Sequence, residues 1–579
     1  MHMEKNPQKS WEVPPRVPVE VEKELASYPP IFRQILYNRG ISDFSEAENF
    51  LEGKEPEYDP FLLKDMDQAV KLIWLAIKEK QRILIFGDYD VDGVTATALL
   101  VQALWRMDGM AIKYIPNRFE EGYGFSSEAL GEVLELEPDL IITVDCGVRS
   151  IREVAAVRKR GIKIVITDHH QPLDTLPEAN AIICPRQPGD SYPNPELSGV
   201  GLAYKIACAL TNIDEYSDLD IKGMLDLVAV GTIADLAKLS PENRVLVRAG
   251  LEQINLRRRP GLNALCAVSG LENASIQASH IGFILGPRLN AAGRLSTADK
   301  AYQLLIAEDR DSAAKLALLL DQENRDRQEI TREIQEKVET WMAEEDTGSD
   351  KLPLIFYSHE EFNEGVLGLA ASRLAEMYYR PAIVGTIKED LIRASCRSIP
   401  EINITSSLDG CKDLLLQHGG HAMAAGLTMR KIHVDRFRER LSELIDEEIS
   451  GLELIPKISA EAEVNLPDLH PNLIPYLSRL EPTGIGNPDP LFISRGVEIL
   501  YPKTVGKDGD HLKFLVQNSE NSKDRRGKIR YDAIAFRFGH LRDELFSSGS
   551  ADILYSYEVN HYNGNERLQL NVRDIKINS

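Results

Sequence analysis

The chain has 579 residues, more than one hydrophobic core normally supports, and this length indicates about two to four domains. Hydrophobic residues make up 43% and charged residues 27% of the chain, ordinary values for a globular protein in water. The formal net charge of −23 argues against a general polyanion-binding surface, so any contact with nucleic acid must come from local basic patches or from metal ions.

Cysteine usage and the N-terminal residues bear on the cellular compartment. The six cysteines are scattered and form no C-x-x-C pair, which argues against a disulfide framework and against a structural zinc site. The first residues, MHMEKNPQKSWEVPP, contain no apolar signal segment, and the chain has no run of about 18 apolar residues. We therefore expect a cytoplasmic protein that makes no contact with a membrane.

The N-terminal half is expected to contain an extension and one α/β domain. Residues 1–60 are rich in Pro and Glu with short helical stretches, and we expect them to pack on the first domain as an extension. In residues 61–310, helical segments alternate with fully apolar segments such as RILIF (82–86), DLIITV (139–144) and KIVIT (163–167). This alternation predicts a parallel sheet covered by helices on both faces.

The C-terminal half is expected to contain a long helix and two further domains. Residues 311–345 contain no Gly or Pro and become strongly charged, so 311–350 is expected to be a connecting helix. Residues 351–456 have the pattern of a second, smaller α/β domain. From 457 to 579, short strand patterns alternate with turns such as GKDGD, which predicts a small β-barrel or sandwich.

Acidic and imidazole groups follow three of the apolar strand segments in the first domain. A fourth acid follows another apolar segment, VGTIAD (230–235). Any one of these acids could be only a helix cap or a turn residue. Because parallel strands deliver their carboxyl ends to one edge, where ligands bind in open α/β sheets, their recurrence indicates a common site. The residues are Asp88, Asp90 and Asp92, then Asp145, then Asp168, His169 and His170, and finally Asp235.

No cation in these segments can balance so many acids. Residues 87–93, 143–147 and 167–170 contain no Lys or Arg, and uncompensated charge in a cleft is costly. Oxygen ligands with one or two imidazoles and no thiolate suit Mg²⁺ or Mn²⁺ better than structural zinc. The number of ligands favours two ions bridged by one carboxylate, a device that attacks phosphate esters or anhydrides.

These segments resemble a known family. DYDVDG, VDCG, TDHH and GTIAD resemble the motifs of the DHH phosphoesterase superfamily, and HGGHAMAAG (418–426) resembles the signature of the DHHA1 domain. IPNRFEEGYGFS (115–126), GPRLNAAGR (286–294) and LEPTGIGNPDP (480–490) narrow the resemblance to RecJ, the bacterial single-strand-specific 5′→3′ exonucleases. The resemblance covers nearly the whole chain and is weakest over the first 30 residues.

The resemblance implies a fold, an activity and a metal site. The fold would be a DHH parallel-sheet domain and a smaller α/β DHHA1 domain joined by a long helix, followed by an OB-fold barrel. The enzyme would release 5′ mononucleotides from single-stranded DNA in repair and recombination, with two Mn²⁺ or Mg²⁺ ions. The implied metal ligands are Asp90, Asp92, Asp145, His169 and Asp235, with Asp145 as the bridge. Asp88 and His170 would lie in or directly behind the coordination shell, and with Asp145 they are the catalytic candidates.

Other residues are candidates for holding the DNA strand. Guanidinium groups suit phosphate oxygens, although an arginine here could instead pair with the local acids. Gly420 and His421 could approach a phosphate, although a Gly-Gly pair is most often a turn. Ser395 and Arg397 could form a pocket for a 5′-terminal phosphate. The nucleic-acid-binding candidates are Arg118, Arg288, Asn290, Arg294, Ser395, Arg397, Gly420 and His421.

The C-terminal domain offers basic residues close to aromatic ones, the combination used for single-strand binding. Its basic candidates are Lys503, Lys507, Lys513, Arg525, Arg526, Lys528 and Arg530, and its aromatic candidates are Phe514, Tyr531, Phe536 and Phe538. The basic loop could instead be merely solvated, and Phe536 and Phe538 could belong to the core.

Rival functions remain open at this point. A phosphodiesterase for oligoribonucleotides or cyclic dinucleotides would resemble the DHH and DHHA1 portion alone, so the extra β-rich domain argues against it. A catalytically silent replication scaffold would have lost metal ligands, and all are present. A pyrophosphatase fits the metal chemistry but needs no chain of this length. The family implies single-strand binding protein and a helicase as partners, and we expect a monomer.

Overall fold

The computed structural model describes residues 6–54, 56–122, 124–213, 216, 218–344, 352–518, 529–562 and 565–578. The chain divides into two compact units. The first contains Met1–Gln8, Tyr58–Ala237 and Ala249–Pro456, and the second contains Lys9–Glu57, Lys238–Arg248 and Lys457–Ser579. No helix in the described part of the chain has both the length and the apolar character needed to cross a bilayer.

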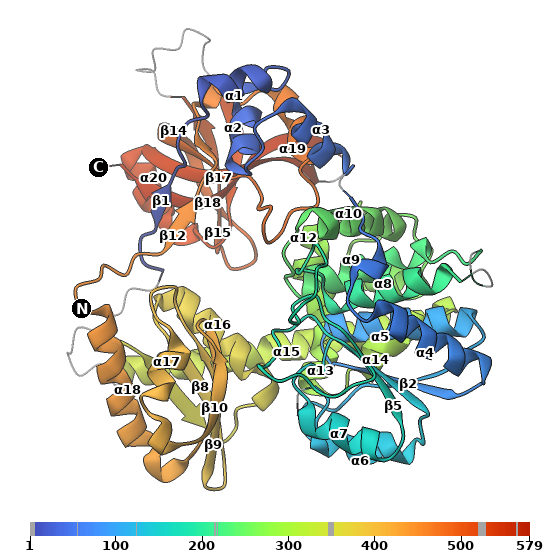
Figure 1. The fold of residues 1–579 in the computed structure, drawn as a ribbon. Coiled ribbons are helices and arrows are strands. Elements are labelled where there is room, and N and C mark those ends of the chain that lie inside the picture. Colours follow the sequence, from blue (N-terminus) through green and yellow to red (C-terminus); the bar gives the residue numbers. More distant parts are fainter. Residues whose placement is uncertain are drawn as a thin grey trace. The chain divides into compact units, whose positions relative to one another are not determined.

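A five-stranded parallel sheet forms the centre of the first domain, as predicted (Figure 1). Its order is β3-β2-β4-β5-β6, so the chain starts near one edge and finishes at the other. All residues of β4 are buried, because helices cover both faces. The strands are β2 (Arg82–Gly87), β3 (Met110–Tyr114), β4 (Leu140–Val144), β5 (Lys163–Thr167) and β6 (Ala181–Ile183).

Two layers of helices cover this sheet. On one face, α6 and α7 pack on side chains such as Phe86, Ile141 and Ile166. On the other face, α5 and α8 contact the strands and each other, and α9 packs against both helices. The helices of this region are α4 (Met66–Lys78), α5 (Val91–Arg106), α6 (Ser127–Glu135), α7 (Ile151–Lys159), α8 (Gly199–Thr211), α9 (Leu225–Ala234), α10 (Pro241–Asn255), α11 (Pro260–Val268), α12 (Ala278–His280), the π-helical η4 (Ile281–Leu285), α13 (Gly286–Leu295) and α14 (Asp299–Ile306).

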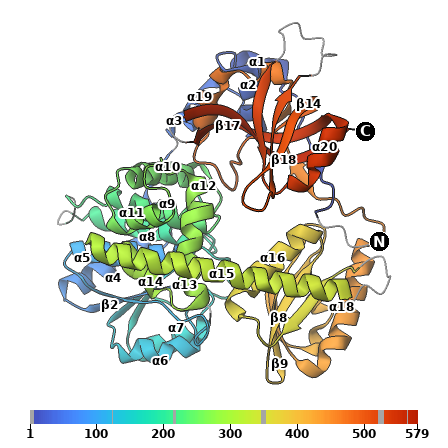
Figure 2. The same ribbon diagram turned by 180° about the vertical axis from the view of Figure 1, so that it is seen from behind.

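One long helix, α15 (Arg310–Glu344), connects the first domain to the second within the first unit (Figure 2). It packs on α11, α13 and α14, and its side chains Ile334 and Val338 join the core around α16. The long connecting helix is therefore confirmed, although positions 345–350 of the predicted segment lie outside the described residues.

The second domain is a mixed five-stranded sheet of order β10-β11-β9-β8-β7. Helix α16 and the end of α15 cover one face, and α17 and α18 cover the other. The elements are β7 (Ile355–His359), α16 (Leu367–Tyr378), β8 (Ala382–Lys388), β9 (Leu391–Arg397), α17 (Ile404–Asp409), β10 (Leu415–His421), β11 (Ala424–Arg430) and α18 (Val434–Ile449).

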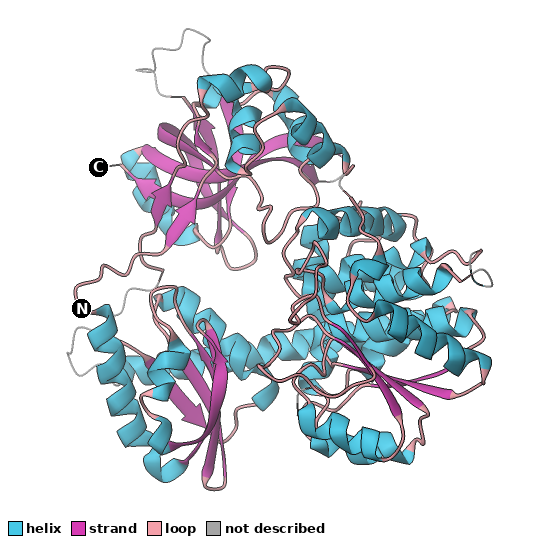
Figure 3. Cartoon of the chain, viewed as in Figure 1, coloured by secondary structure: helices cyan, strands magenta, loops and turns pink. Residues whose placement is uncertain are grey.

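The C-terminal strands close into a five-stranded barrel, which confirms the predicted OB fold (Figure 3). Closure comes from the pairing of β14 with β17. Phe514 and Tyr531 lie in the barrel core, so the prediction that they stack on bases is wrong, whereas Phe536 is 48% exposed. Arg525, Arg526 and Lys528 lie outside the described residues. The elements are β13 (Ala462–Glu463), α19 (Ile474–Ser478), β14 (Phe492–Val505), β15 (His511–Gln517), β16 (Arg530–Ala535), α20 (Arg542–Ser548), β17 (Ser550–Tyr562) and β18 (Asn565–Ile577).

The N-terminal extension does not pack where we expected. Residues 9–57 belong to the second unit, so the prediction that residues 1–60 pack on the first domain is wrong for nearly all of them. Phe32, Ile35 and Leu36 share one hydrophobic core with barrel residues such as Phe492 and Tyr555, because the helices are too short to bury their apolar faces alone. The extension comprises β1 (Ser10–Glu12), which pairs with β12 (Lys457–Ser459), and the helices α1 (Val19–Glu24), α2 (Pro30–Asn38) and α3 (Phe44–Glu52).

This shared core makes a prediction about stability. Replacing the fully buried Phe32 with alanine should lower the free energy of unfolding of the second unit by about 3–5 kcal/mol. Urea-dependent hydrogen exchange at β14 and β17 measures that unit separately. Phe546→Ala, which removes a 74% exposed ring from α20, is the matched control and should change the value by less than about 0.5 kcal/mol. Equal effects of the two substitutions would show that the extension does not support the barrel.

Candidate metal centre

The acidic and imidazole side chains predicted from the sequence come together at the carboxyl ends of β2, β4 and β5, where they are joined by Asp235 from the end of helix α9. Asp90 caps α5 by accepting a hydrogen bond of 3.0 Å from the amide of Gly93, which fixes the turn that carries Asp88 and Asp92. Asp145 follows β4 in the left-handed region, with φ of 63°. A Cβ at Gly199 would lie 2.6 Å from the Cβ of Asp145, so α8 can approach this aspartate only through a glycine.

Ligand atoms of three overlapping groups lie close enough to share metal ions. The groups are Asp145–His169–His170, Asp92–His169–Asp235 and Asp88–Asp90–Asp145, and the ligand atoms within each lie within 4.8 Å of one another. His169 Nε2 is 3.0 Å from Asp145 Oδ1, 3.8 Å from Asp235 Oδ2 and 4.0 Å from Asp92 Oδ2. Asp145 and His169 each belong to two groups, which places them at the centre of the cluster.

The N-terminus of α8 holds Asp92 in place. The amides of Gly199 and Val200 donate to its two carboxylate oxygens over 2.6 and 2.8 Å. Burial and the neighbouring Asp90 nevertheless raise the pKa of Asp92 to about 7, against the opposing effect of these hydrogen bonds. The helix N-terminus therefore orients this carboxylate without compensating the negative charge around it.

The cluster is electrostatically incomplete. Burial, with Asp92 and Asp90 nearby, raises the pKa of Asp235 to about 8, and burial with the surrounding aspartates raises the pKa of Asp145 well above its usual range. Asp88 Oδ1, Asp145 Oδ1 and His169 Nε2 are buried and make no hydrogen bond, although the last two atoms lie 3.0 Å apart. Among the described residues, no lysine or arginine forms an ion pair with these aspartates. Buried oxygen and imidazole donors that lack a cation fit a hard divalent ion.

The remaining acid of the motif, Asp168, has a different role. It accepts hydrogen bonds from the amides of Val148 and His170, and its Oδ1 lies 2.7 Å from Nδ1 of His170. The imidazole opposes the effect of burial and lowers the pKa of Asp168, and this carboxylate in turn raises the pKa of His170 despite partial burial. Asp168 therefore fixes the orientation of the half-exposed His170 ring beside the cluster.

Arginines gather beside the cluster and form no ion pair with an acid among the described residues. The Arg118 guanidinium lies 5.2 Å from the centre of the Tyr89 ring. Burial and then the charges of Arg118 and Arg327 lower the pKa of Arg294 to about 10. Burial and the charge of Arg118 also lower the pKa of Arg397, which extends from β9 of the second domain. Such crowding of positive charge is relieved by an anion, and a phosphate group fits it.

A small cavity of about 130 Å³ adjoins this arginine group. Sequence reasoning missed Arg327, which lies on α15 outside every motif. It also missed Tyr89, which stands between two acids of the first motif. The cavity is lined by Ala234, Gly282, Gly286, Pro287, Asn290, Arg294, Arg327 and Leu369.

Other candidate DNA-binding residues already have structural partners. Arg288 forms a 3.0 Å ion pair with Asp321 of α15. This is the alternative considered from the sequence, in which an arginine pairs with an acid and not with a phosphate. The side-chain oxygen Oδ1 of Asn290 accepts a hydrogen bond from the amide of Val91 over 3.2 Å and so supports the loop of acids. A Cβ at Gly420 would lie 2.3 Å from the carbonyl oxygen of Ala424, so strand packing by itself requires a glycine there. Ser395 and His421 lie on β9 and β10 of the same sheet.

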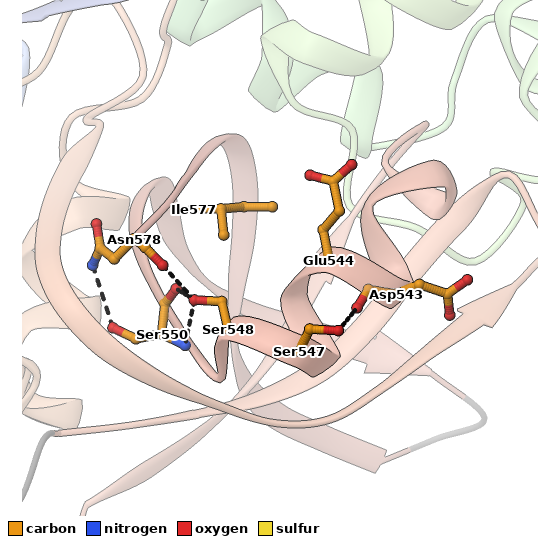
Figure 4. Close-up of a pocket in the computed structure, with 7 residues that line it drawn as sticks. All are labelled: Asp543, Glu544, Ser547, Ser548, Ser550, Ile577 and Asn578. Carbon is orange, nitrogen blue, oxygen red and sulfur yellow. Dashed lines mark hydrogen bonds between the residues drawn. The ribbon is translucent and has the colours of Figure 1, made fainter.

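A larger hollow of about 810 Å³ lies in the C-terminal domain (Figure 4). Asp543 and Glu544 of α20 line it together with hydroxyl and amide groups, and it contains no basic residue. Its carboxylates would repel a phosphate backbone, so this hollow does not suit nucleic acid. The lining residues are Asp543, Glu544, Ser547, Ser548, Ser550, Ile577 and Asn578.

Comparison with known proteins agrees with this geometry. Residues 82–232 match the DHH family, N-terminal domain, residues 351–447 match the DHHA1 domain, and residues 460–574 match the RecJ OB domain. The single-stranded-DNA-specific exonuclease RecJ of Bacillus subtilis is 34% identical over 98% of this chain and 71% of that protein. The RecJ of Dickeya dadantii is 36% identical over 95% of this chain and 96% of that protein.

Solved structures extend the likeness to the fold. The crystal structure of RecJ in complex with Mn²⁺ from Thermus thermophilus superposes with a TM-score of 0.82 at 27% identity, over 98% of this chain and 80% of that one. The Mg²⁺ complex of the same protein gives a TM-score of 0.75 at 26% identity, over 98% and 78%. Every residue of the donor groups except Asp235 lies in the matched DHH region, and the chain belongs to the RecJ family of single-stranded-DNA-specific exonucleases.

Proposed function

We propose that this protein hydrolyses single-stranded DNA from its 5′ end and releases 5′ mononucleotides. The observation that carries this proposal is the cluster of buried, unpartnered carboxylate and imidazole atoms at the strand ends, which requires cations. The relatives named above act on single-stranded DNA, and the similar structures contain Mn²⁺ or Mg²⁺. Polarity follows from the family and not from the geometry of the cluster.

The proposed metal ligands are Asp90, Asp92, Asp145, His169 and Asp235. Asp145 suits the bridging role because it belongs to two of the three donor groups. Two ions held there would supply Lewis-acid activation and neutralisation of charge on the phosphodiester. Asp88 lies in the donor group with Asp90 and Asp145 and has one buried oxygen without a hydrogen-bond partner, so we assign it to the catalytic machinery too.

The protein's own groups orient the reacting parts. The α8 amides hold Asp92, and Asp168 holds Nδ1 of His170. The ring of His170 is 38% exposed and is the imidazole best placed to meet the phosphate or the departing 3′ oxygen. Prior alignment of such groups lowers the reorganisation that the transition state requires.

The arginine group is the proposed binding site for the 5′ end of the strand. Arg118, Arg294 and Arg397 would share the charge of the terminal phosphate, with Ser395, Gly420 and His421 contributed by β9 and β10. Arg288 and Asn290 are more useful as supports, because their side chains already bind Asp321 and the amide of Val91. Contacts to phosphate and not to base edges would make cleavage insensitive to sequence.

The cellular setting is also a proposal. Work on DNA ends in repair and recombination would place the protein in the cytoplasm, with single-strand binding protein and a helicase as partners that expose the substrate. We propose that it acts as a monomer, since the complete donor cluster comes from one chain. The rival role of an inactive scaffold is disfavoured because no ligand is missing, and a nuclease confined to dinucleotides would not need the OB domain.

The central position of Asp145 predicts the effect of its removal. Asparagine tolerates the left-handed backbone conformation at position 145, so Asp145→Asn should not strain the chain. The substitution removes a charged ligand from two donor groups, and the cleavage rate should therefore fall about 10³-fold or more. Release of mononucleotides from a 5′-labelled single strand at saturating Mn²⁺ measures this rate. Asp446→Asn, at an exposed position on α18, is the control and should keep the wild-type rate. A variant that retains more than about a tenth of that rate would refute the assignment of Asp145.

The arginine group predicts a preference for phosphorylated ends. Arg397→Ala should lower the ratio of kcat/KM for 5′-phosphate over 5′-hydroxyl strands by about tenfold, because a charge-assisted contact to the terminal phosphate is lost. Arg393→Ala is a matched control from the same strand, since Arg393 pairs with Glu364 and is 51% exposed. If Arg397→Ala slows both kinds of end equally, the residue does not recognise the terminal phosphate.

A further inference from the structure

Arg186 lies on a fixed turn beside the metal-binding side chains. The turn runs from Cys184 to Gln187, and the Gln187 amide donates to the Cys184 carbonyl over 2.9 Å. The buried side chain of Gln187 donates to the carbonyl of Ile182 over 2.6 Å. The sulfur of Cys184 is 3.7 Å from the carbonyl oxygen of His170, which attaches this turn to the segment that carries His169. The turn therefore holds Arg186 at the same sheet edge as the cluster.

The guanidinium group is oriented from a second direction. Its Nε donates to the carbonyl of Pro195 over 3.2 Å, and its Nη2 donates to Glu196 over 3.0 Å. These partners directly precede the start of α8, where Gly199 donates to Asp92. Arg186 is thus fixed between a segment attached to His170 and a segment attached to Asp92. Its side chain remains 33% exposed, and within the described residues its Nη1 has no hydrogen-bond partner.

The ion pair of Arg186 is with Glu196 and not with an aspartate of the cluster, so Arg186 does not neutralise the metal ligands by direct contact.

The sheet order separates Arg186 from the other arginine group. Arg118 follows β3 at one edge of the sheet, whereas Arg186 follows β6 at the opposite edge. With strands about 4.8 Å apart, β3 and β6 are separated by roughly 19 Å along the edge, and the ends of β2, β4 and β5 with their acids lie between them. The edge therefore has cationic groups on both sides of the cluster.

We propose that Arg186 binds the phosphate group next to the scissile phosphate on its 3′ side. This inference rests on the proposed function, in which Arg118, Arg294 and Arg397 take the 5′ end. A strand whose 5′ end is held by these three arginines and whose first phosphodiester is cut at the cluster must continue away from the arginines. Arg186 is an oriented cation on the opposite side of the cluster. A guanidinium with a free N–H suits a phosphate oxygen and requires no particular base. Arg186 is a substrate-binding residue, and Glu196 is its positioning residue.

Short substrates test this assignment. A 5′-phosphorylated dinucleotide has one phosphodiester and no phosphate on the 3′ side of it. In a trinucleotide, the first phosphodiester is followed by one further phosphate. Arg186→Ala should lower kcat/KM for the trinucleotide about 10- to 100-fold more than for the dinucleotide. Arg186→Lys should recover part of the loss, and Glu196→Gln should give a smaller loss with the same substrate pattern. Arg158→Ala is the matched control, since Arg158 also donates to a loop carbonyl but lies on α7, and it should match the wild type.

Two further measurements separate the outcomes. Calorimetric titration with Mn²⁺ should give the same affinity for the wild type and Arg186→Ala. Equal losses on both oligonucleotides, a changed Mn²⁺ affinity, or no loss at all would overturn the proposal. If the wild type cleaves neither oligonucleotide, the proposed exonuclease function fails. Binding of the two oligonucleotides in Ca²⁺ then still tests Arg186, because a contact to the 3′ phosphate must weaken trinucleotide binding selectively in Arg186→Ala.

Discussion

Repulsion among buried carboxylates is the constraint on which the rest of the first domain depends. Asp88, Asp92 and Asp145 are each only 1% exposed, yet the sheet directs them toward one point. Burial and then the neighbouring aspartates raise the pKa values of Asp145 and Asp92, and the hydrogen bonds from α8 to Asp92 do not remove that effect. Cations must therefore compensate the negative charge of these carboxylates, and the surrounding helices contact the carboxylates in ways that keep them in place. α8 meets Asp145 through a glycine, and α13 supports the acidic loop through Asn290.

The arginines complement this constraint. The chain as a whole carries a net charge of −23, so long-range attraction cannot bring a DNA strand to it. Positive charge is instead concentrated at particular positions beside the acids. Burial and mutual repulsion lower the pKa of Arg294, which means that part of the desolvation needed to bind a phosphate has already occurred on folding. Fixed guanidinium groups also lose little side-chain entropy on binding, so they can hold a strand without a large basic surface.

The second unit shows how distant segments complete a small domain. A five-stranded barrel has a limited interior, and Phe492 and Tyr555 share their core with helices from the start of the chain. Arg39 also connects these helices to the rest of the unit, because it forms a 2.6 Å ion pair with Glu461 and donates a 2.7 Å hydrogen bond to Asn487. Asn487 belongs to the GIGNP segment, one of the motifs that resemble the family. The interior position of Phe514 and Tyr531 in turn limits which barrel aromatics can meet a ligand, and Phe536 remains accessible.

The parallel sheet, the long helix, the β-rich C-terminal domain and the group of acids at the strand ends could be predicted from the sequence, because those features depend on local periodicity and on the polarity of parallel strands. The choice of a barrel over a sandwich came from the resemblance to the family. The sequence also supplied each member of the donor groups, since a carboxylate or imidazole directly after an apolar segment is visible in one dimension, although the segment before Asp235 is helix α9 and not a strand. The packing of the folded chain was needed to show that residues 9–57 complete the barrel, that Arg288 pairs with Asp321, that Arg327 lines the cavity beside the arginine group, and that Arg186 is oriented by Pro195 and Glu196. These outcomes depend on which surfaces meet after folding, and side-chain pairs far apart in sequence leave no periodic signal along the chain.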